Sequence, residues 1–167
     1  GLPRAGTGAR MVERAAGHGD GVVGVEIVRR LLRAPALASL KGTVLAVPIV
    51  NAFGFMNHSR YLPDRRDLNR SFPGNSSGSL AARLANLFLR EIVLRSNVGI
   101  DLHSAAIHRT NLPQIRVVPG KPRTLALAEA FGAPLILMSA MREGSLRQIA
   151  AKQDIDVLLY EAGEGLR

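Results

Sequence analysis

Short apolar runs alternate with amphipathic helical segments along most of this chain, and this alternation limits the folds that it can adopt. Runs typical of buried strands cover residues 42–50, 97–102, 114–118, 133–138 and 156–160. Helical patterns cover residues 22–34, 80–96, 124–131 and 145–152, with Pro35 and Gly132 as stop signals. The alternation predicts an α/β fold of three layers, α/β/α, in which helices cover both faces of a largely parallel, mixed central sheet.

The helical segment over residues 80–96 carries the clearest start signal. Ser79 directly precedes it and can cap its first turn. The spacing of large apolar residues predicts that its core positions are Leu80, Leu84, Leu87, Phe88 and Leu94.

The size and composition of the chain are those of one globular domain. Its 167 residues, 47% of them hydrophobic, suffice for a single core, and with few aromatics that core is built from Val, Leu, Ile and Ala. The absence of Cys excludes disulfides and thiolate chemistry. No apolar run approaches the roughly 20 residues that cross a bilayer, and no secretory signal is visible, so we expect a cytoplasmic protein without membrane contact.

The charge of the chain is strongly basic, with a formal net charge of +9. Nucleic-acid binding is one interpretation of such a charge. The arginines are scattered along the sequence and are not interleaved with stacking aromatics, which disfavours nucleic acid as a partner. A solvated arginine-rich surface with a few anion-binding arginines is the preferred interpretation.

The segment from Asn51 to Gly74, named the arginine segment below, is the richest in candidate binding residues. Its sequence, NAFGFMNHSRYLPDRRDLNRSFPG, places four arginines and an amide between Gly and Pro residues: Arg60, Arg65, Arg66, Asn69 and Arg70. Guanidinium groups beside an amide suit the binding of a carboxylate or the polarising of a carbonyl. A solvated run of charge is the alternative interpretation.

Three further residues are candidates for chemistry, and each has a simpler explanation. His18 lies in the glycine-rich stretch GHGDG, where a histidine is more often merely exposed. His103 follows a buried strand in DLHS, where it could instead be a satisfied core histidine. Glu161 follows the apolar strand DVLLY, a suitable place for a general base, or it could be an ordinary loop glutamate.

Taken together, four stretches resemble the succinylglutamate desuccinylase and aspartoacylase family of zinc-carboxypeptidase-like hydrolases. They are HGDGVVGVEIVRRL, GFMNHSRYLPDRRDLNRSFPG, GIDLHSAA with RTNLPQIRV, and VLLYEAGEGLR. The resemblance runs from about His18 to the last residue, and DLNRSFPG and DLHSAA are its most specific pieces.

The resemblance implies one zinc ion per chain, with a bound water as the nucleophile, and it assigns a role to each candidate residue. His18 and His103 match metal ligands, and Glu161 matches the general base. Arg60 matches the arginine that stabilises the oxyanion. Asn69 and Arg70 match the pair that binds the substrate carboxylate, with Arg66 as an alternative for either arginine role.

The sequence departs from the family pattern in three places. Gly21 stands where the family has the glutamate ligand of an HxxE motif, so zinc should be held more weakly. Residues 1–16 show no strand pattern where the family has an apolar strand, and we expect an irregular lead-in before a catalytic domain over residues 17–167. The β-rich part that follows in the family is absent, so we expect a fold truncated at both ends.

The favoured hypothesis is therefore a zinc-dependent deacylase, amidohydrolase or esterase whose partner is a small anionic molecule such as an N-acyl amino acid. The alternative is a degenerate or truncated homologue that retains the fold and an anion-binding segment but has little activity. A basic nucleic-acid-binding domain ranks third. Exposed sheet edges of a truncated fold also favour self-association into a homo-oligomer.

Overall fold

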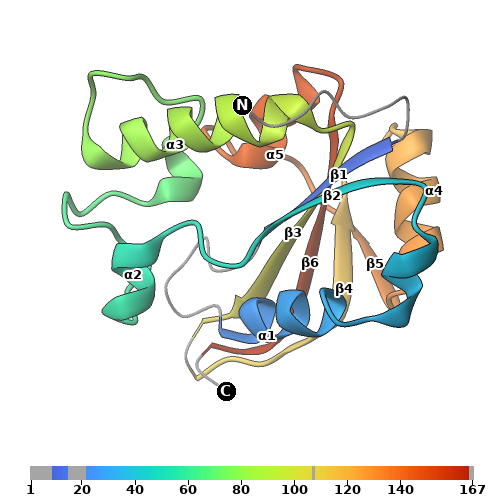
Figure 1. Cartoon of the computed structure of the whole chain (residues 1–167). Helices are drawn as coiled ribbons and strands as arrows, with labels where there is room; N and C mark the ends of the chain where they lie inside the picture. The colour runs from blue at the N-terminus through green and yellow to red at the C-terminus, as the bar shows by residue number, and fades with distance from the viewer. Residues whose placement is uncertain (1–8, 15–21, 107, 166–167) are drawn as a thin grey trace.

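The structure, a computed structural model, describes residues 9–14, 22–106 and 108–165 (Figure 1). Six strands form one sheet: β1 (Ala9–Arg14), β2 (Gly42–Val47), β3 (Val98–Ala105), β4 (Asn111–Val117), β5 (Leu135–Met138) and β6 (Asp156–Glu164). The α-helices are α1 (Val22–Leu31), α2 (Ala52–Met56), α3 (Leu80–Glu91), α4 (Pro122–Phe131) and α5 (Leu146–Ala151). Three 3-10 turns, η1 (Pro35–Ser39), η2 (Leu68–Arg70) and η3 (Val93–Arg95), complete the described elements.

The sheet is mixed, as the sequence predicts. Its strand order is β2-β1-β3-β6-β4-β5. Neighbours pair in parallel except β4 and β6, which are antiparallel, so β4 and β5 run against the other four strands. β6 therefore sits between two partners of opposite direction, and the start of β4 lies beside the end of β6.

The expectation of an irregular lead-in is wrong for Ala9–Arg14, which forms β1. This strand pairs in parallel with β2 through all six of its residues and with β3 through four of them. The sequence ARMVER carries three charged residues and lacks the apolar run of a buried strand, so local pattern hides it. Ladder hydrogen bonds on both sides override that weak propensity. The rest of residues 1–16 lies outside the described residues.

Alternation along β6 shows which helices cover each face of the sheet. Val157 packs in a cluster with residues of α3 and α5, whereas Leu158 packs with residues of α4. Leu102 of β3 packs against Val28 of α1. Successive strand residues point to opposite faces, so α3 and α5 cover one face, and α1 and α4 cover the other. The three-layer α/β/α prediction is confirmed.

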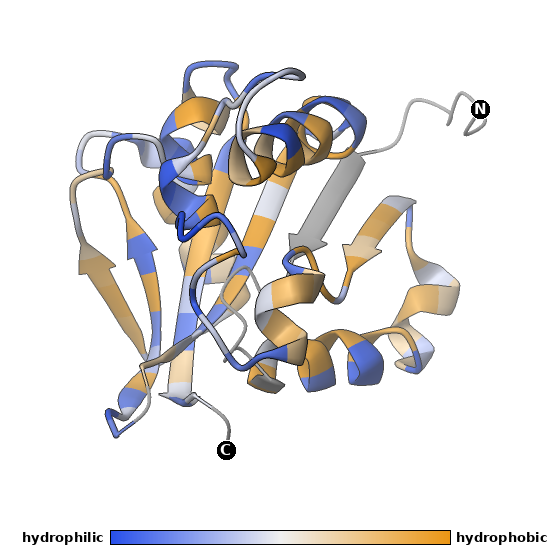
Figure 2. Ribbon diagram, turned by 90° about the vertical axis from the view of Figure 1, so that its left-hand side faces the viewer, coloured by the Kyte–Doolittle hydropathy of each residue, from blue (hydrophilic) through white to orange (hydrophobic). Residues whose placement is uncertain are grey.

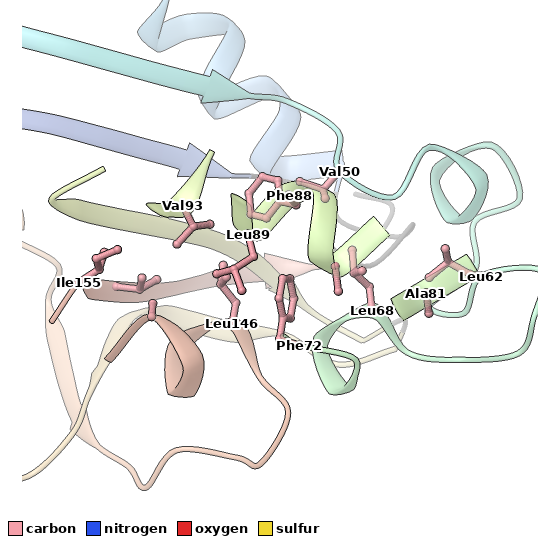
Figure 3. Close-up of a cluster of buried hydrophobic side chains, with 13 residues drawn as sticks. Val50, Leu62, Leu68, Phe72, Ala81, Phe88, Leu89, Val93, Leu146 and Ile155 are labelled. Atoms are coloured by element: carbon pink, nitrogen blue, oxygen red, sulfur yellow. The ribbon is translucent and has the colours of Figure 1, made fainter. Parts of the chain in front are cut away.

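The largest buried cluster lies under α3 and α5 and holds the arginine segment in place (Figure 3). Leu62, Leu68 and Phe72 from this segment are buried there, and the Phe72 and Phe88 rings meet edge to face with centroids 6.5 Å apart. Strands are largely hydrophobic in Figure 2, while hydrophilic residues gather in loops and on outer helix surfaces. Buried apolar anchors thus fix a segment whose polar side chains remain free to form a site.

The predicted core face of α3 is only partly correct. Phe88 is buried and Leu80 and Leu84 pack against the large cluster, but Leu87 and Leu94 are 58% and 45% exposed. The buried positions follow Ala81, Ala85, Phe88 and Leu89, a regular helical stripe in which small alanines allow close approach. The α-helix also ends at Glu91, so Leu94 lies in the η3 turn and off that stripe.

The predicted starts of α3 and α5 and the predicted end of α4 agree with the observed caps, whereas α1 and α3 end at Leu31 and Glu91, before the predicted residues 34 and 96. The hydroxyl oxygens of Ser79 and Ser145 accept hydrogen bonds from the backbone N–H of Ala82 and Gln148, and Gly132 ends α4 with φ of 78°. In the described part of the chain, no helix has the length and apolar character needed to cross a membrane.

Candidate active site

A cleft of about 450 Å³ opens where β3 and β6 end, on the face of the sheet that α3 and α5 cover. Among the predicted site residues, the cleft brings together His103, Glu161, Arg60, Asn69 and Arg70. Arg66 does not line the cleft. It is exposed on the surface, in a turn where its backbone N–H donates to Asp64. His18 and Gly21 lie outside the described residues.

His103 and Glu161 are paired neighbours on adjacent parallel strands, β3 and β6. Both side chains are largely buried, at 9% and 13% exposure. Nε2 of His103 lies 3.0 Å from Oδ1 of Asp101, which is on the same side of β3. A carboxylate behind the ring is a common arrangement for a metal-binding histidine, because it fixes the orientation of the imidazole.

The described residues contain no cluster of three or more His, Asp or Glu side chains that could hold a metal ion. The described part of the cleft offers one side chain of a metal-ligand type, His103, beside Asp101. Any further ligand from the stretch around His18 belongs to residues that the structure does not describe.

Asp67 organises the arginine segment, although sequence reasoning gave it no role. Its Oδ2 accepts from Nη2 and Nε of Arg60 at 2.7 and 3.0 Å, and its Oδ1 accepts from the backbone N–H of Asn69 at 2.8 Å. One carboxylate therefore sets both the direction of the Arg60 guanidinium and the turn that carries Asn69 and Arg70.

Asn69 is tied to α5 as well as lining the cleft. Its Oδ1 accepts from the backbone N–H of Leu146 at 3.0 Å, across 77 residues of sequence. Nearby, the Phe72 N–H donates to the Gly144 carbonyl at 3.0 Å. The Asn69 amide nitrogen is the group that remains for a ligand, while Arg70 donates through Nη1 to the Asn69 carbonyl.

Glu161 accepts two hydrogen bonds from β4, both on the same oxygen. Nδ2 of Asn111 lies 2.5 Å and Nη2 of Arg116 lies 3.1 Å from Oε2. Neither residue was a candidate from the sequence, although Asn111 and Arg116 fall inside the quoted stretch RTNLPQIRV. The antiparallel pairing of β4 with β6 brings these two residues to Glu161, and the sequence pattern does not reveal that pairing.

Arg147, in the first turn of α5, is also missed by sequence reasoning. Its guanidinium donates to the carbonyls of Arg116 and Ala140 and to the hydroxyl of Ser139, at 3.1 to 3.3 Å. Burial lowers the pKa of Arg147 below its usual range, and the charge of Arg116 lowers it further. The protein therefore holds two guanidinium groups close together despite their repulsion.

Positive charge dominates the described part of the cleft. Among the described residues, six arginines line it, against the two carboxylates Asp101 and Glu161: Arg60, Arg70, Arg109, Arg116, Arg142 and Arg147. Residues scattered in the sequence thus converge on one concave surface, which favours an anionic ligand.

The sequence also matches a known protein family. Residues 7–167 match the succinylglutamate desuccinylase/aspartoacylase catalytic domain. The chain belongs to this family. The proteins that the family model and the curated relative name are deacylases, and the fold is zinc-carboxypeptidase-like, which confirms the resemblance drawn from the sequence.

Relatives of the family agree in sequence and in fold. The chain is 33% identical over 127 residues to the N-alpha-acetyl-L-2,4-diaminobutyric acid deacetylase of Halomonas elongata, covering 72% of this chain and 37% of that protein. The product-bound ectoine utilization protein EutE (DoeB) of Ruegeria pomeroyi matches with a TM-score of 0.86 and 25% identity, over 96% of this chain and 51% of that one.

A second solved structure, a succinylglutamate desuccinylase/aspartoacylase from Rhodobacter sphaeroides, matches with a TM-score of 0.85 and 28% identity. That match covers 95% of this chain and 49% of the other. The chain thus spans about half of the solved structures, and just over a third of the curated relative, that it matches.

Proposed function

We propose that this chain is the catalytic domain of a zinc-dependent hydrolase that cleaves the acyl bond of an N-acyl amino acid or a similar small carboxylate. The observation that carries the proposal is the side-by-side placement of His103 and Glu161 in a cleft that six of the described arginines line. This arrangement puts a metal-ligand type, a carboxylate base and anion-binding groups within one cleft.

Zinc held by His103 and His18 would act as a Lewis acid toward water and the acyl carbonyl. Glu161 takes a proton from the attacking water and passes it to the leaving amine. Arg60 donates to the oxygen that gains negative charge. The Asn69 amide nitrogen and the Arg70 guanidinium bind the substrate carboxylate, which orients the acyl bond toward Glu161.

Zinc content and hydrolysis together test this proposal. The purified chain, reconstituted with zinc and freed of excess metal, should retain about one zinc per molecule, and it should release the amino acid from N-acetyl or N-succinyl amino acids. Chelation should remove both properties. A reconstituted chain that holds no zinc and hydrolyses none of these substrates would contradict the proposal.

The second candidate, a degenerate homologue with little activity, rests on Gly21 in place of the family's glutamate ligand. The substitution Gly21→Glu separates the two candidates. We expect it to tighten zinc binding by about 10-fold or more, because it restores an anionic ligand, and to raise turnover. If neither quantity changes, the stretch around His18 is not a metal site.

A further inference from the structure

We propose that Asn111 and Arg116 are positioning residues that hold the Glu161 carboxylate with one oxygen turned to the reaction and the other fixed to β4. The inference rests on the proposed role of Glu161 as the general base. It concerns a strand that contributes none of the residues assigned to metal, oxyanion or substrate carboxylate.

The first observation is that both donors bind the same atom. Asn111 and Arg116 donate to Oε2 of Glu161, and among the described residues Oε1 has no hydrogen-bond partner. A carboxylate gripped on one oxygen has a fixed orientation, while its second oxygen keeps its lone pairs for a proton. If Arg116 paired with both carboxylate oxygens, neither oxygen would be left to accept a proton.

The second observation is an irregularity in the β4–β6 ladder. Gln114 pairs with Glu161 and Asn111 pairs with Gly163, so three steps along β4 match two along β6. In a regular ladder Asn111 would point to the opposite face from Gln114 and Arg116. The extra residue, in the stretch of exposed Leu112 and Pro113, turns Asn111 to the face that carries Glu161. Bulges commonly redirect side chains beside active sites.

The third observation is that the arrangement is a poor one for stability alone. Nε of Arg116 is buried and has no hydrogen-bond partner in the described part of the chain. The neighbouring Arg147 adds like charge. An unpaired buried donor lowers the stability of the fold, and such costs are characteristic of functional sites. A purely structural ion pair would not need a second guanidinium group beside Arg116, whose carbonyl accepts from Arg147.

Kinetics of the zinc-reconstituted chain test the inference through Asn111→Ala, Arg116→Ala and Arg116→Lys. We expect each alanine variant to lower kcat by about 10-fold or more with KM nearly unchanged, because a misaligned base loses transition-state stabilisation and not substrate binding. Arg116→Lys should fall between Arg116→Ala and the original chain. The matched control is Arg95→Ala, which breaks an arginine–carboxylate pair with Glu91 outside the cleft and should leave kcat unchanged.

A purely structural role predicts a different outcome, a lower unfolding temperature with kcat retained in the folded fraction, and that result would overturn the proposal. Should Arg116→Ala fail to fold, Asn111→Ala at the start of the strand gives the same test. If the original chain hydrolyses no acyl amino acid, the proposed function fails and a second measurement decides the inference. Crystal structures of the alanine variants should then show the Glu161 carboxylate rotated, and an unmoved carboxylate would disprove positioning.

Discussion

Asn69 shows how one side chain can serve both the fold and the ligand. Its amide has two different ends, an oxygen that accepts from the Leu146 N–H and a nitrogen that remains in the cleft. The same residue therefore joins the arginine segment to α5 and offers a donor to a carboxylate. These two contributions can be separated, because aspartate keeps an acceptor at this position and loses the donor.

Asn69→Ala and Asn69→Asp should consequently differ in what they damage. The alanine variant leaves the Leu146 N–H without its acceptor and should lower the free energy of unfolding by about 1–2 kcal/mol. The aspartate variant should stay within about 0.5 kcal/mol of the original chain, since it keeps the acceptor for the Leu146 N–H and nearly the same side-chain size. It should nevertheless lose affinity for carboxylates through repulsion. Chemical denaturation and ligand titration of both variants measure this, and equal stability of the two would refute the tie to α5.

At the scale of elements, the site depends on a close contact between two loops. Gly144, which leads into α5, has φ of 67°, and a Cβ there would lie 2.6 Å from the Arg70 carbonyl oxygen. Gly120 has a similar φ of 76°, but a Cβ there would meet nothing within 4 Å. The pair of glycines therefore separates the cost of backbone conformation from the cost of contact.

Gly120→Ala should lower the free energy of unfolding by about 1 kcal/mol, the cost of left-handed backbone for a residue with a Cβ. Gly144→Ala should cost about 1–3 kcal/mol more, because the arginine segment must shift away from α5. It should also weaken carboxylate binding, which Gly120→Ala should leave intact. Urea denaturation and ligand titration provide the measurements, and equal costs for the two variants would show that the loops do not press on each other.

Most elements could be predicted because their signals are local. Ser79, Ser145 and Gly132 mark helix ends through side-chain or backbone properties that act within a few residues. β1 could not be predicted from ARMVER, because what stabilises it are its two neighbouring strands. The site divides in the same way. Recognisable sequence motifs contain five of the residues that line the cleft: Arg60, Asn69, Arg70, His103 and Glu161. Asn111 and Arg116, by contrast, reach Glu161 only through the antiparallel pairing of β4 with β6.

For the whole molecule, the convergence of arginines on the cleft predicts salt-sensitive binding of small dianions. We expect the dissociation constant for a dicarboxylate such as succinate to rise several-fold between about 0.05 M and about 0.5 M salt, because screening shortens the reach of charges that do not touch the ligand. Calorimetry on succinate, with the neutral succinamide as control, checks this. Affinity for succinate that is insensitive to salt would mean that contact pairs alone hold the anion.

The position of β6 has a consequence for how the molecule folds. β6 follows every other described strand in sequence, yet it lies between β3 and β4 in the middle of the sheet (Figure 1). During synthesis, the edges of β3 and β4 that face β6 therefore stay unpaired until β6 has been made. Contacts between distant parts of a chain also form slowly. Insertion of β6 closes the sheet and delivers Glu161 to His103 and Arg116 in the same event. A nascent chain therefore lacks the pairing of His103 with Glu161 until β6 has entered the sheet.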